Sequence, residues 1–157
     1  MINVRKIAKL ITGDNLYWKL KFFYATKKWP NIYDPTFFNE KVRWRMLHDQ
    51  NYLYVKCADK YEVRNYIEKK IGSEYLVPLR YMFTNNDDIT DKCILSNSVA
   101  KSNHGAGMIE FIPETYSLSE LKNTFGKWLN IDYTSESNEK HYSRIPRKIL
   151  IEESLCK

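Results

Sequence analysis

The stretch SVAKSNHGAGMIEFI, residues 98–112, carries the pattern that decides the fold. A β-like run reaches Lys101, two glycines follow at 105 and 107, and an apolar run resumes at Met108. Two such runs separated by a short glycine loop predict a β-hairpin. The loop would expose consecutive backbone N–H groups with no Cβ beside them, an arrangement that can bind phosphate oxygens.

Polar side chains flank that loop. Lys101 and Asn103 lie two residues apart on one strand face, so the ammonium group would stand beside the loop and neutralise phosphate charge. The motif NHGAG alone is also compatible with a plain hairpin turn and a solvated lysine. It is neither a Walker A loop nor a Rossmann fingerprint, because no GxxxxGKS or GxxxxGKT pattern is present and no helix directly follows.

The rest of the chain alternates helical and strand patterns. Apolar residues at helical spacing predict one helix over 36–48 and another, continuous helix over 55–71 that ends at Gly72. Ser117 and Glu120 form a capping-box pattern ahead of a helix over 118–130. Strands are predicted over 74–83, with Pro78 at an edge or bulge, and from Ile149 onward. A short polar helix or turn over 86–93 and a loop over 132–146 complete an α/β chain.

Positive charge is concentrated at the start of the sequence. The net charge is +6, and residues 1–30 hold seven basic side chains against one acid, Asp14, so the remaining 18 basic and 18 acidic residues balance. The same segment contains six aromatic residues, Tyr17, Trp18, Phe22, Phe23, Tyr24 and Trp29. Such a helix suits an anionic membrane surface, or it packs on its own domain with its lysines in water. Nucleic-acid binding is not expected, because no second basic element forms a groove.

The composition indicates an ordinary globular protein. The 157 residues fit one folded domain, which we divide into a basic aromatic helical segment over 1–32 and a main domain over 33–157. No apolar run approaches the roughly 20 residues of a membrane span, and no secretory signal is evident. We therefore expect a cytoplasmic protein, peripheral at the inner face of the membrane if residues 1–30 bind there. The three cysteines, at 57, 93 and 156, lack disulfide-framework or zinc spacing.

Two further elements add candidate binding residues. Lys60 and Arg64 are four residues apart in the helical pattern, so one helix face would present both cations. Ile149–Ile151 are followed directly by Glu152, Glu153, Ser154 and Leu155. At this end of a buried strand, backbone and carboxylate groups could form hydrogen bonds with the edge of a purine base. Each feature alone is also explained by ordinary solvated side chains.

Taken together, the order and spacing of four motifs closely resemble the TupA-like ATP-grasp family of surface-polysaccharide biosynthesis proteins. The motifs are DPTFFNEKVRW, LYVKCADKYEVRNYIEKKIGSEYLVPL, VAKSNHGAG and RKILIEESL, within residues 33–157. The family pattern has a small hydroxyl residue between the glycines, and this chain has Ala106 there. The fold implied is a partial ATP-grasp unit: N-terminal helices followed by a small, mostly antiparallel sheet with helices.

The resemblance implies a role for each candidate residue. Lys101 would hold the α- and β-phosphates of ATP beside Asn103, and the loop of His104, Gly105, Ala106 and Gly107 would cover the β/γ end. Arg64, helped by Lys60, would supply a second cation. The stretch from Glu152 to Leu155 would form the adenine hinge, in which the main chain near Glu153 and Leu155 contacts the base. The implied reaction is phosphorylation of a carboxylate followed by attack of an amine or hydroxyl, whereas the frequent label glycosyltransferase implies sugar transfer to a polysaccharide precursor.

The family's magnesium ligands and ribose-binding acid are expected well after the adenine hinge. We find no metal ligands in this chain, so the sequence suggests a truncated product or the N-terminal piece of a longer enzyme that uses ATP and magnesium. One alternative is a non-catalytic remnant that binds nucleotide or a partner chain. Another is a metal-dependent glycosyltransferase using Asp87 and Asp88, which lack DxD spacing. A membrane-surface adaptor working through residues 1–30 is compatible with the ATP-grasp reading.

Overall fold

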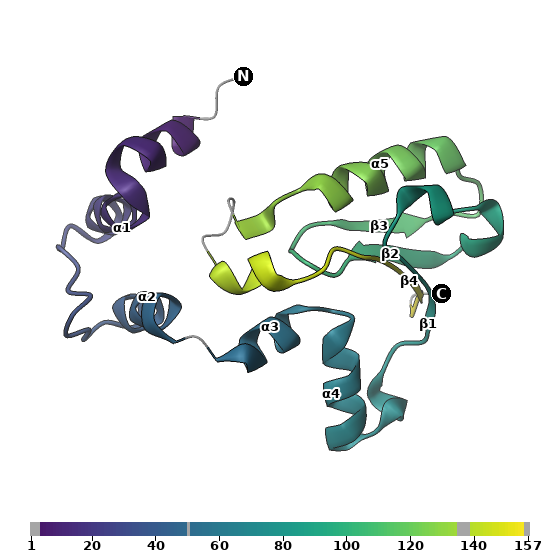
Figure 1. The fold of residues 1–157 in the computed structure, drawn as a ribbon, viewed down its shortest axis with the longest axis horizontal. Coiled ribbons are helices and arrows are strands. Elements are labelled where there is room, and N and C mark those ends of the chain that lie inside the picture. The colour runs from purple at the N-terminus through teal and green to yellow at the C-terminus, as the bar shows by residue number, and fades with distance from the viewer. Residues whose placement is uncertain (1–3, 50, 135–138, 156–157) are drawn as a thin grey trace. The chain divides into compact units, whose positions relative to one another are not determined.

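The computed structural model describes residues 4–49, 51–134 and 139–155 of the chain. These form two compact units, Met1–Gln50 and Asn51–Lys157. The first unit is helical, and the second contains the sheet together with further helices (Figure 1). The separate division that we draw between residues 32 and 33 stays a prediction.

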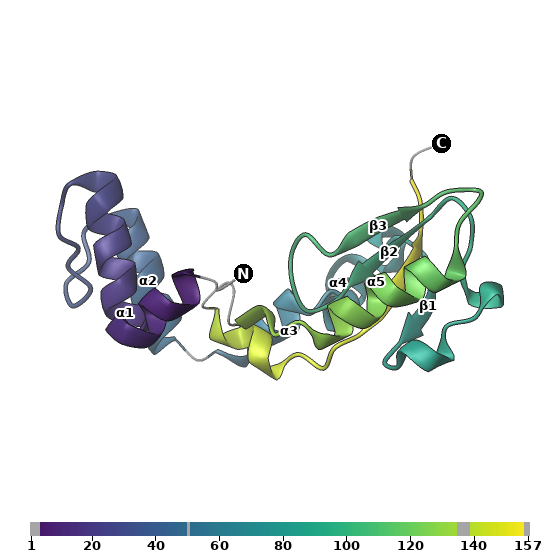
Figure 2. The same cartoon turned by 90° about the horizontal axis from the view of Figure 1, so that it is seen from above.

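The first unit consists of α1 (Val4–Thr26) and α2 (Phe38–His48), which lie side by side (Figures 1 and 2). Gly13 interrupts α1 with a φ of 71° and ψ of 157°, outside the helical region, so the helix bends there. Arg43 joins the two helices, because its Nη2 donates to Asn15 Oδ1 at 2.7 Å and its guanidinium lies 5.7 Å from the Trp18 ring centroid.

The entry to α2 is organised by a buried acid. The Glu40 carboxylate accepts hydrogen bonds from the backbone N–H groups of Asn31, Thr36 and Phe37, at 2.8, 3.0 and 2.9 Å. These bonds, that from Phe37 foremost, hold the pKa of the Glu40 carboxyl below its ordinary value, against the opposing effect of burial. The predicted helix over 36–48 is confirmed, with its start two residues later.

The second unit contains a four-stranded sheet in the order β1-β4-β2-β3, with every neighbouring pair antiparallel. The strands are β1 (Leu79–Phe83), β2 (Ser98–Ser102), β3 (Ile109–Ile112) and β4 (Ile149–Glu153). Lys101 is opposite Ile109 on one side and Leu150 on the other. The predicted hairpin of residues 98–112 is therefore confirmed, as is the mixed α/β fold with a small antiparallel sheet.

Helices cover the two faces of this sheet (Figure 1). On one face α5 (Leu118–Asn130) packs its Leu121 and Phe125 against Ala100, Ile149 and Ile151, all of which are buried. On the other side of the sheet α4 (Glu62–Ile71) is joined to β4 by Arg64, which contacts Glu152. The short helix α3 (Tyr52–Ala58) packs against α4 and the Lys140–Arg144 turn. The amphipathic pattern of residues 118–130 thus predicts both the helix and its buried side, and Ser117 Oγ accepts the expected cap hydrogen bond from Glu120 N.

Two predicted elements are corrected by the structure. The helix expected over 55–71 is two helices, because the Asp59 carboxylate turns the chain by accepting hydrogen bonds from Tyr61 N and Glu62 N at 2.8 and 3.3 Å. The strand expected over 74–83 begins only at Leu79, after a 3-10 turn over Ser73–Tyr75. Pro78 has no N–H to donate to a strand ladder, and its carbonyl instead accepts a hydrogen bond from Glu153 N.

The remaining segments are short. The polar stretch predicted over 86–93 forms 3-10 turns at Asn86–Asp88 and Asp91–Cys93, and another turn spans Lys140–Arg144. Part of the predicted loop, residues 135–138, lies outside the described residues, as does Cys156, whereas Cys57 and Cys93 are free thiols. None of the helices in the described ranges has the length and apolarity needed to cross a bilayer.

Candidate functional site

A buried acid and two cations meet on the sheet face opposite α5. Because strand side chains alternate, Lys101 and Glu152 point away from the face that carries Ala100 and Ile151. Arg64 reaches across from α4, and its Nη1 lies 3.1 Å from Glu152 Oε1, while Lys101 Nζ forms an ion pair with Glu152 Oε2. Glu152 is only 4% exposed. A single buried carboxylate therefore holds both cations in place.

A third cation joins this face from the connection between α3 and α4. Lys60 Nζ donates a hydrogen bond to the carbonyl oxygen of Gly105, which ties the connection to the glycine loop. Burial lowers the pKa of Lys60, and the positive charge of Lys101 lowers it further, whereas Asp59 and Glu152 act in the opposite direction. The structure thus brings Lys60, Lys101 and Glu152 into electrostatic contact.

Asn103 holds the loop in place with its side-chain amide. Its Nδ2 donates to Asp59 Oδ1 at 2.9 Å and to the Pro146 carbonyl at 2.8 Å, while its Oδ1 accepts from Lys148 N at 2.7 Å. The side chain is fully buried. Both amide hydrogens are thereby used inside the protein, so the structure gives Asn103 a positioning role and leaves it no spare donor for a ligand.

The glycine loop has one internal and one exposed glycine. A Cβ at Gly105 would come within 2.7 Å of the Tyr133 ring and would also overlap Met108, so internal packing requires a glycine there. Gly107 has a φ of 76° and open space around it, so it is needed for the turn. Ala106 and Gly107 are exposed. Within the part of the chain that the structure describes, the three amide groups of residues 105–107 donate no hydrogen bond.

His104 anchors the start of the loop in the protein interior. It is 2% exposed, and its Nδ1 lies 2.7 Å from Ser102 Oγ. Among the described residues Nε2 has no hydrogen-bond partner. Burial lowers the pKa of the imidazole, as do the charges of Arg147 and Lys60, while nearby backbone groups of Ile131 and Trp128 raise it. The ring does not face solvent, and it acts as a neutral part of the core.

The predicted adenine hinge lies at the end of β4. Glu153 N donates to the Pro78 carbonyl at 3.1 Å, and the Glu153 carboxylate forms an ion pair with Arg80. Leu155 is 77% exposed. The hinge residues therefore continue directly from the strand that carries Glu152, but the groups of Glu153 already have partners within the sheet.

Sequence reasoning missed Asp59 as the residue that joins these elements. This buried carboxylate accepts a backbone hydrogen bond at the start of α4 and also accepts the hydrogen bond from Asn103. It therefore connects the segment that carries Lys60 and Arg64 to the glycine loop. Its signal was present, because Asp59 followed three residues later by Glu62 is a helix-start pattern. The helical periodicity running across both residues concealed the break.

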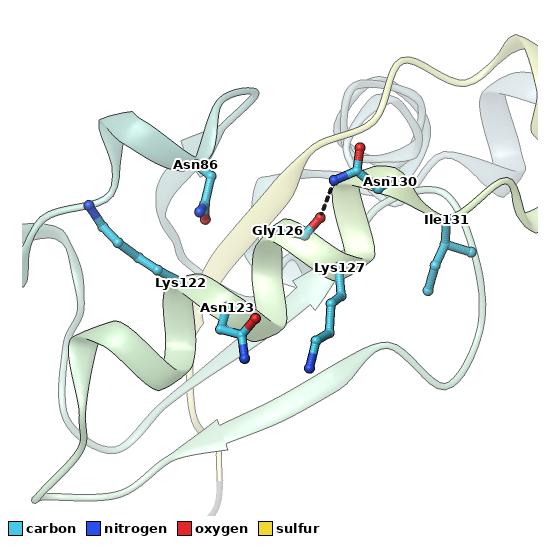
Figure 3. Close-up of a pocket in the computed structure, with 7 residues that line it drawn as sticks. All are labelled: Asn86, Lys122, Asn123, Gly126, Lys127, Asn130 and Ile131. Atoms are coloured by element: carbon cyan, nitrogen blue, oxygen red, sulfur yellow. Dashed lines mark hydrogen bonds between the residues drawn. The ribbon is translucent and has the colours of Figure 1, made fainter.

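Two surface hollows lie away from these cations. One borders α5 and the Asn86 turn, and Figure 3 shows Lys122 and Lys127 on the helix beside it. Because α5 packs on the opposite sheet face from Arg64, this hollow is not part of the cation cluster. The second hollow includes Arg80 and Glu153 at the strand end. Neither hollow includes Lys60, Lys101 or the glycine loop.

The groups present fit phosphate better than a metal ion. Ammonium, guanidinium and unbonded amide groups are the donors that proteins use for phosphate oxygens. In the ranges 4–49, 51–134 and 139–155 there is no group of three or more His, Cys, Asp or Glu side chains placed to hold a metal ion. The Glu152 carboxylate on this face is already occupied by Arg64 and Lys101.

Comparison with known proteins agrees with the motifs. A family model described as TupA-like ATPgrasp matches residues 40–157, which include most of α2 and the whole second unit. Comparison with curated proteins and with solved structures gave no significant match. The match covers more than half of the chain and contains every candidate binding residue discussed above.

Proposed function

Because the chain belongs to the TupA-like ATP-grasp family, we propose that its second unit binds the phosphates of ATP on the sheet face that carries Lys101. Lys101 and Arg64 would contact the phosphate chain, and Lys60 would add a third positive charge. The amides of Gly105, Ala106 and Gly107 would donate to the terminal phosphate. Asn103 and His104 would position the loop rather than touch the nucleotide.

The observation that carries this proposal is the convergence of three cations beside the glycine loop. Lys60, Arg64 and Lys101 come from different elements. Glu152 pairs with Arg64 and Lys101, and Asp59 adds a second negative charge that acts on Lys60, so three positive charges stand against two negative ones. The cluster therefore retains excess positive charge beside a loop with unbonded amide groups. A polyphosphate would complement that charge, and the contact would be stronger than in water because the cations are partly buried.

The proposed activity is an ATP-dependent ligase or transferase step in the assembly of a bacterial capsule or exopolysaccharide. In the ligase form, a substrate carboxylate would take the γ-phosphoryl group, and ADP would leave. An amine or hydroxyl of a polysaccharide precursor would then displace phosphate. The main chain around Glu153 and Leu155 would border the adenine. Magnesium, which ATP-grasp enzymes generally use, would supply further charge neutralisation, and its protein ligands are not assigned to this chain.

Calorimetric titration of the chain with ATP, ADP and adenosine tests the phosphate contact. We expect affinity to rise with the number of phosphates, and Lys101→Met to raise the Kd for ATP by roughly tenfold or more, the value of one charge-assisted hydrogen bond. Lys92→Met removes an exposed lysine of the same unit and is the matched control. Equal affinity for adenosine and ATP, or unchanged binding by Lys101→Met, would disprove the proposal.

A non-catalytic remnant is the second candidate function, and the occupied state of Glu152 and Glu153 favours it. Their carboxylates are already paired within the protein, so neither is available as a reactive acid without rearrangement. The two candidates differ in one measurement. Thermal protection by ATP together with no magnesium-dependent ATP turnover would identify a binding remnant, whereas turnover would identify an enzyme.

A further inference from the structure

The segment of α1 that follows Gly13 has apolar residues on two opposite sides. Trp18 and Phe22 lie on the side that faces α2, where the Trp18 ring contacts Arg43. Leu16, Leu20 and Phe23 occupy the other side, because a spacing of four and three residues places them in one row. Their exposed fractions are 43%, 45% and 44%. One apolar side is thus used in packing within the first unit, and the other is open.

The shorter segment of α1 before Gly13 also exposes apolar residues. Ile7, Leu10 and Ile11 have the spacing that brings three residues onto one helix face. Leu10 is 86% exposed and Ile11 is 79% exposed. A surface helix in a globular protein normally exposes polar residues, so these six exposed apolar residues need a partner that takes them out of water. We refer to Ile7, Leu10, Ile11, Leu16, Leu20 and Phe23 as the α1 apolar surface.

Charge indicates which partner fits. The whole excess of +6 lies in residues 1–30, whereas the rest of the chain is balanced. Lys21, Lys27 and Lys28 are exposed, and the last two extend over the rings of Tyr24 and Phe37, at 4.8 and 5.0 Å from their centroids. Trp29 is also exposed. Exposed apolar side chains beside lysines and a tryptophan are the features of helices that lie in an anionic membrane interface.

We propose that α1 binds the surface of an anionic lipid bilayer through the α1 apolar surface, with its lysines at the headgroups. The helix would lie in the plane of the membrane and would not cross it. Its apolar side chains would enter the headgroup and acyl boundary, and the lysines would gain energy from the negative surface potential. This inference is independent of nucleotide binding, because it involves only residues of the first unit.

Co-sedimentation of the full chain with lipid vesicles tests the proposal. We expect binding to vesicles of about one-third phosphatidylglycerol in phosphatidylcholine, and much weaker binding to pure phosphatidylcholine or at high salt. Leu10→Ser with Ile11→Ser should weaken partitioning at least about tenfold, since both side chains would be buried in the interface. Lys21→Gln with Lys27→Gln should weaken it about fivefold for each lysine.

Matched variants distinguish loss of the α1 apolar surface or of its lysines from a general loss of exposed apolar residues or of positive charge. Ile109→Ser with Phe111→Ser removes two exposed apolar residues from β3, and Lys69→Gln with Lys92→Gln removes the same charge from the second unit. Both should bind vesicles like the original chain. Leu10 and Ile11 are so exposed that their replacement should leave helicity unchanged by circular dichroism.

Two results would overturn the proposal. One is that the α1 variants bind vesicles as well as the matched controls do. Failure of every protein, including the original chain, to bind vesicles would count in the same way. The other is loss of self-association in Leu10→Ser with Ile11→Ser, measured by sedimentation velocity, without any change in vesicle binding. That second result would assign the α1 apolar surface to contact with another copy of the chain.

Discussion

Arg64 Nη1 lies 3.1 Å from Glu152 Oε1, although 88 residues separate the two in sequence. The ion pair fixes α4 to the end of β4, and Arg64 Nη2 adds a hydrogen bond to the Val77 carbonyl at 2.6 Å. Both side chains are largely shielded from solvent, with 17% and 5% exposed. The pair therefore determines where the positive charge of α4 stands relative to Lys101.

Replacing Glu152 by glutamine should have opposite effects on stability and on phosphate affinity. The variant leaves Arg64 and Lys101 without a counter-ion, which should lower the free energy of unfolding by about 2–4 kcal/mol. The same change removes a negative charge from the proposed phosphate site, so ATP should bind more tightly to the folded variant. Urea unfolding and calorimetric titration measure the two quantities. Glu153→Gln is the control, because its exposed pair with Arg80 should contribute at most about 1 kcal/mol.

Asn103→Ala should be among the more destabilising single replacements near the loop. It removes two donated hydrogen bonds and leaves the Pro146 carbonyl and Lys148 N without their partner, at a cost of about 2–4 kcal/mol. Urea unfolding measures this loss. Asn130→Ala removes one exposed hydrogen bond, to Gly126 O, and should cost under about 1 kcal/mol. Equal losses for the two variants would contradict the assigned role of Asn103.

Sequence periodicity predicted those elements whose local pattern and tertiary packing agree. The hairpin of residues 98–112 and the helix over 118–130 formed as expected, since their apolar positions match the buried face of the sheet. The continuous helix over 55–71 was wrong because Asp59 makes long-range hydrogen bonds that periodicity does not report. At Asp59, the hydrogen bond with Asn103 outweighs the local preference of the sequence for a continuous helix.

Sequence spacing also located the candidate site, but it did not assign how each side chain is used. Lys101 and Arg64 were expected beside phosphate, and the structure brings them together through Glu152, which was expected only near adenine. Asn103 was expected beside the ligand, and its buried amide instead supports the loop. Such pairings depend on which buried groups need partners, which a linear pattern does not show.

The two loop glycines should respond differently to alanine. Gly105→Ala places a Cβ against the Tyr133 ring and Met108, so it should lower stability by about 2–3 kcal/mol through overpacking. Gly107→Ala has open space, and only its positive φ opposes the change, at about 1–2 kcal/mol. Thermal or urea unfolding ranks the variants, with Ala106→Gly as a control at an exposed position. A larger loss for Gly107→Ala would show that the packing around Gly105 is not as described.

His104 should make the fold sensitive to mild acid. Burial, followed by the charge of Arg147, lowers the pKa of this imidazole in the folded protein, so below about pH 6.5 the unfolded chain binds more protons than the folded one. The stability from neutral His104 is therefore complete above that pH and is lost as the pH falls, by at most about 1.4 kcal/mol per pH unit for one proton. Urea unfolding at a series of pH values measures the slope.

His104→Gln removes this proton site, and its unfolding free energy should depend less on pH between neutrality and mild acid. Subtracting the two pH profiles cancels the titration of the carboxylates, which both proteins share. His48→Gln, at an exposed position of α2, is the matched control substitution. Parallel profiles for the original chain and His104→Gln would show that His104 is not buried in its neutral form, and the loop anchor inferred from its contact with Ser102 would then be incorrect.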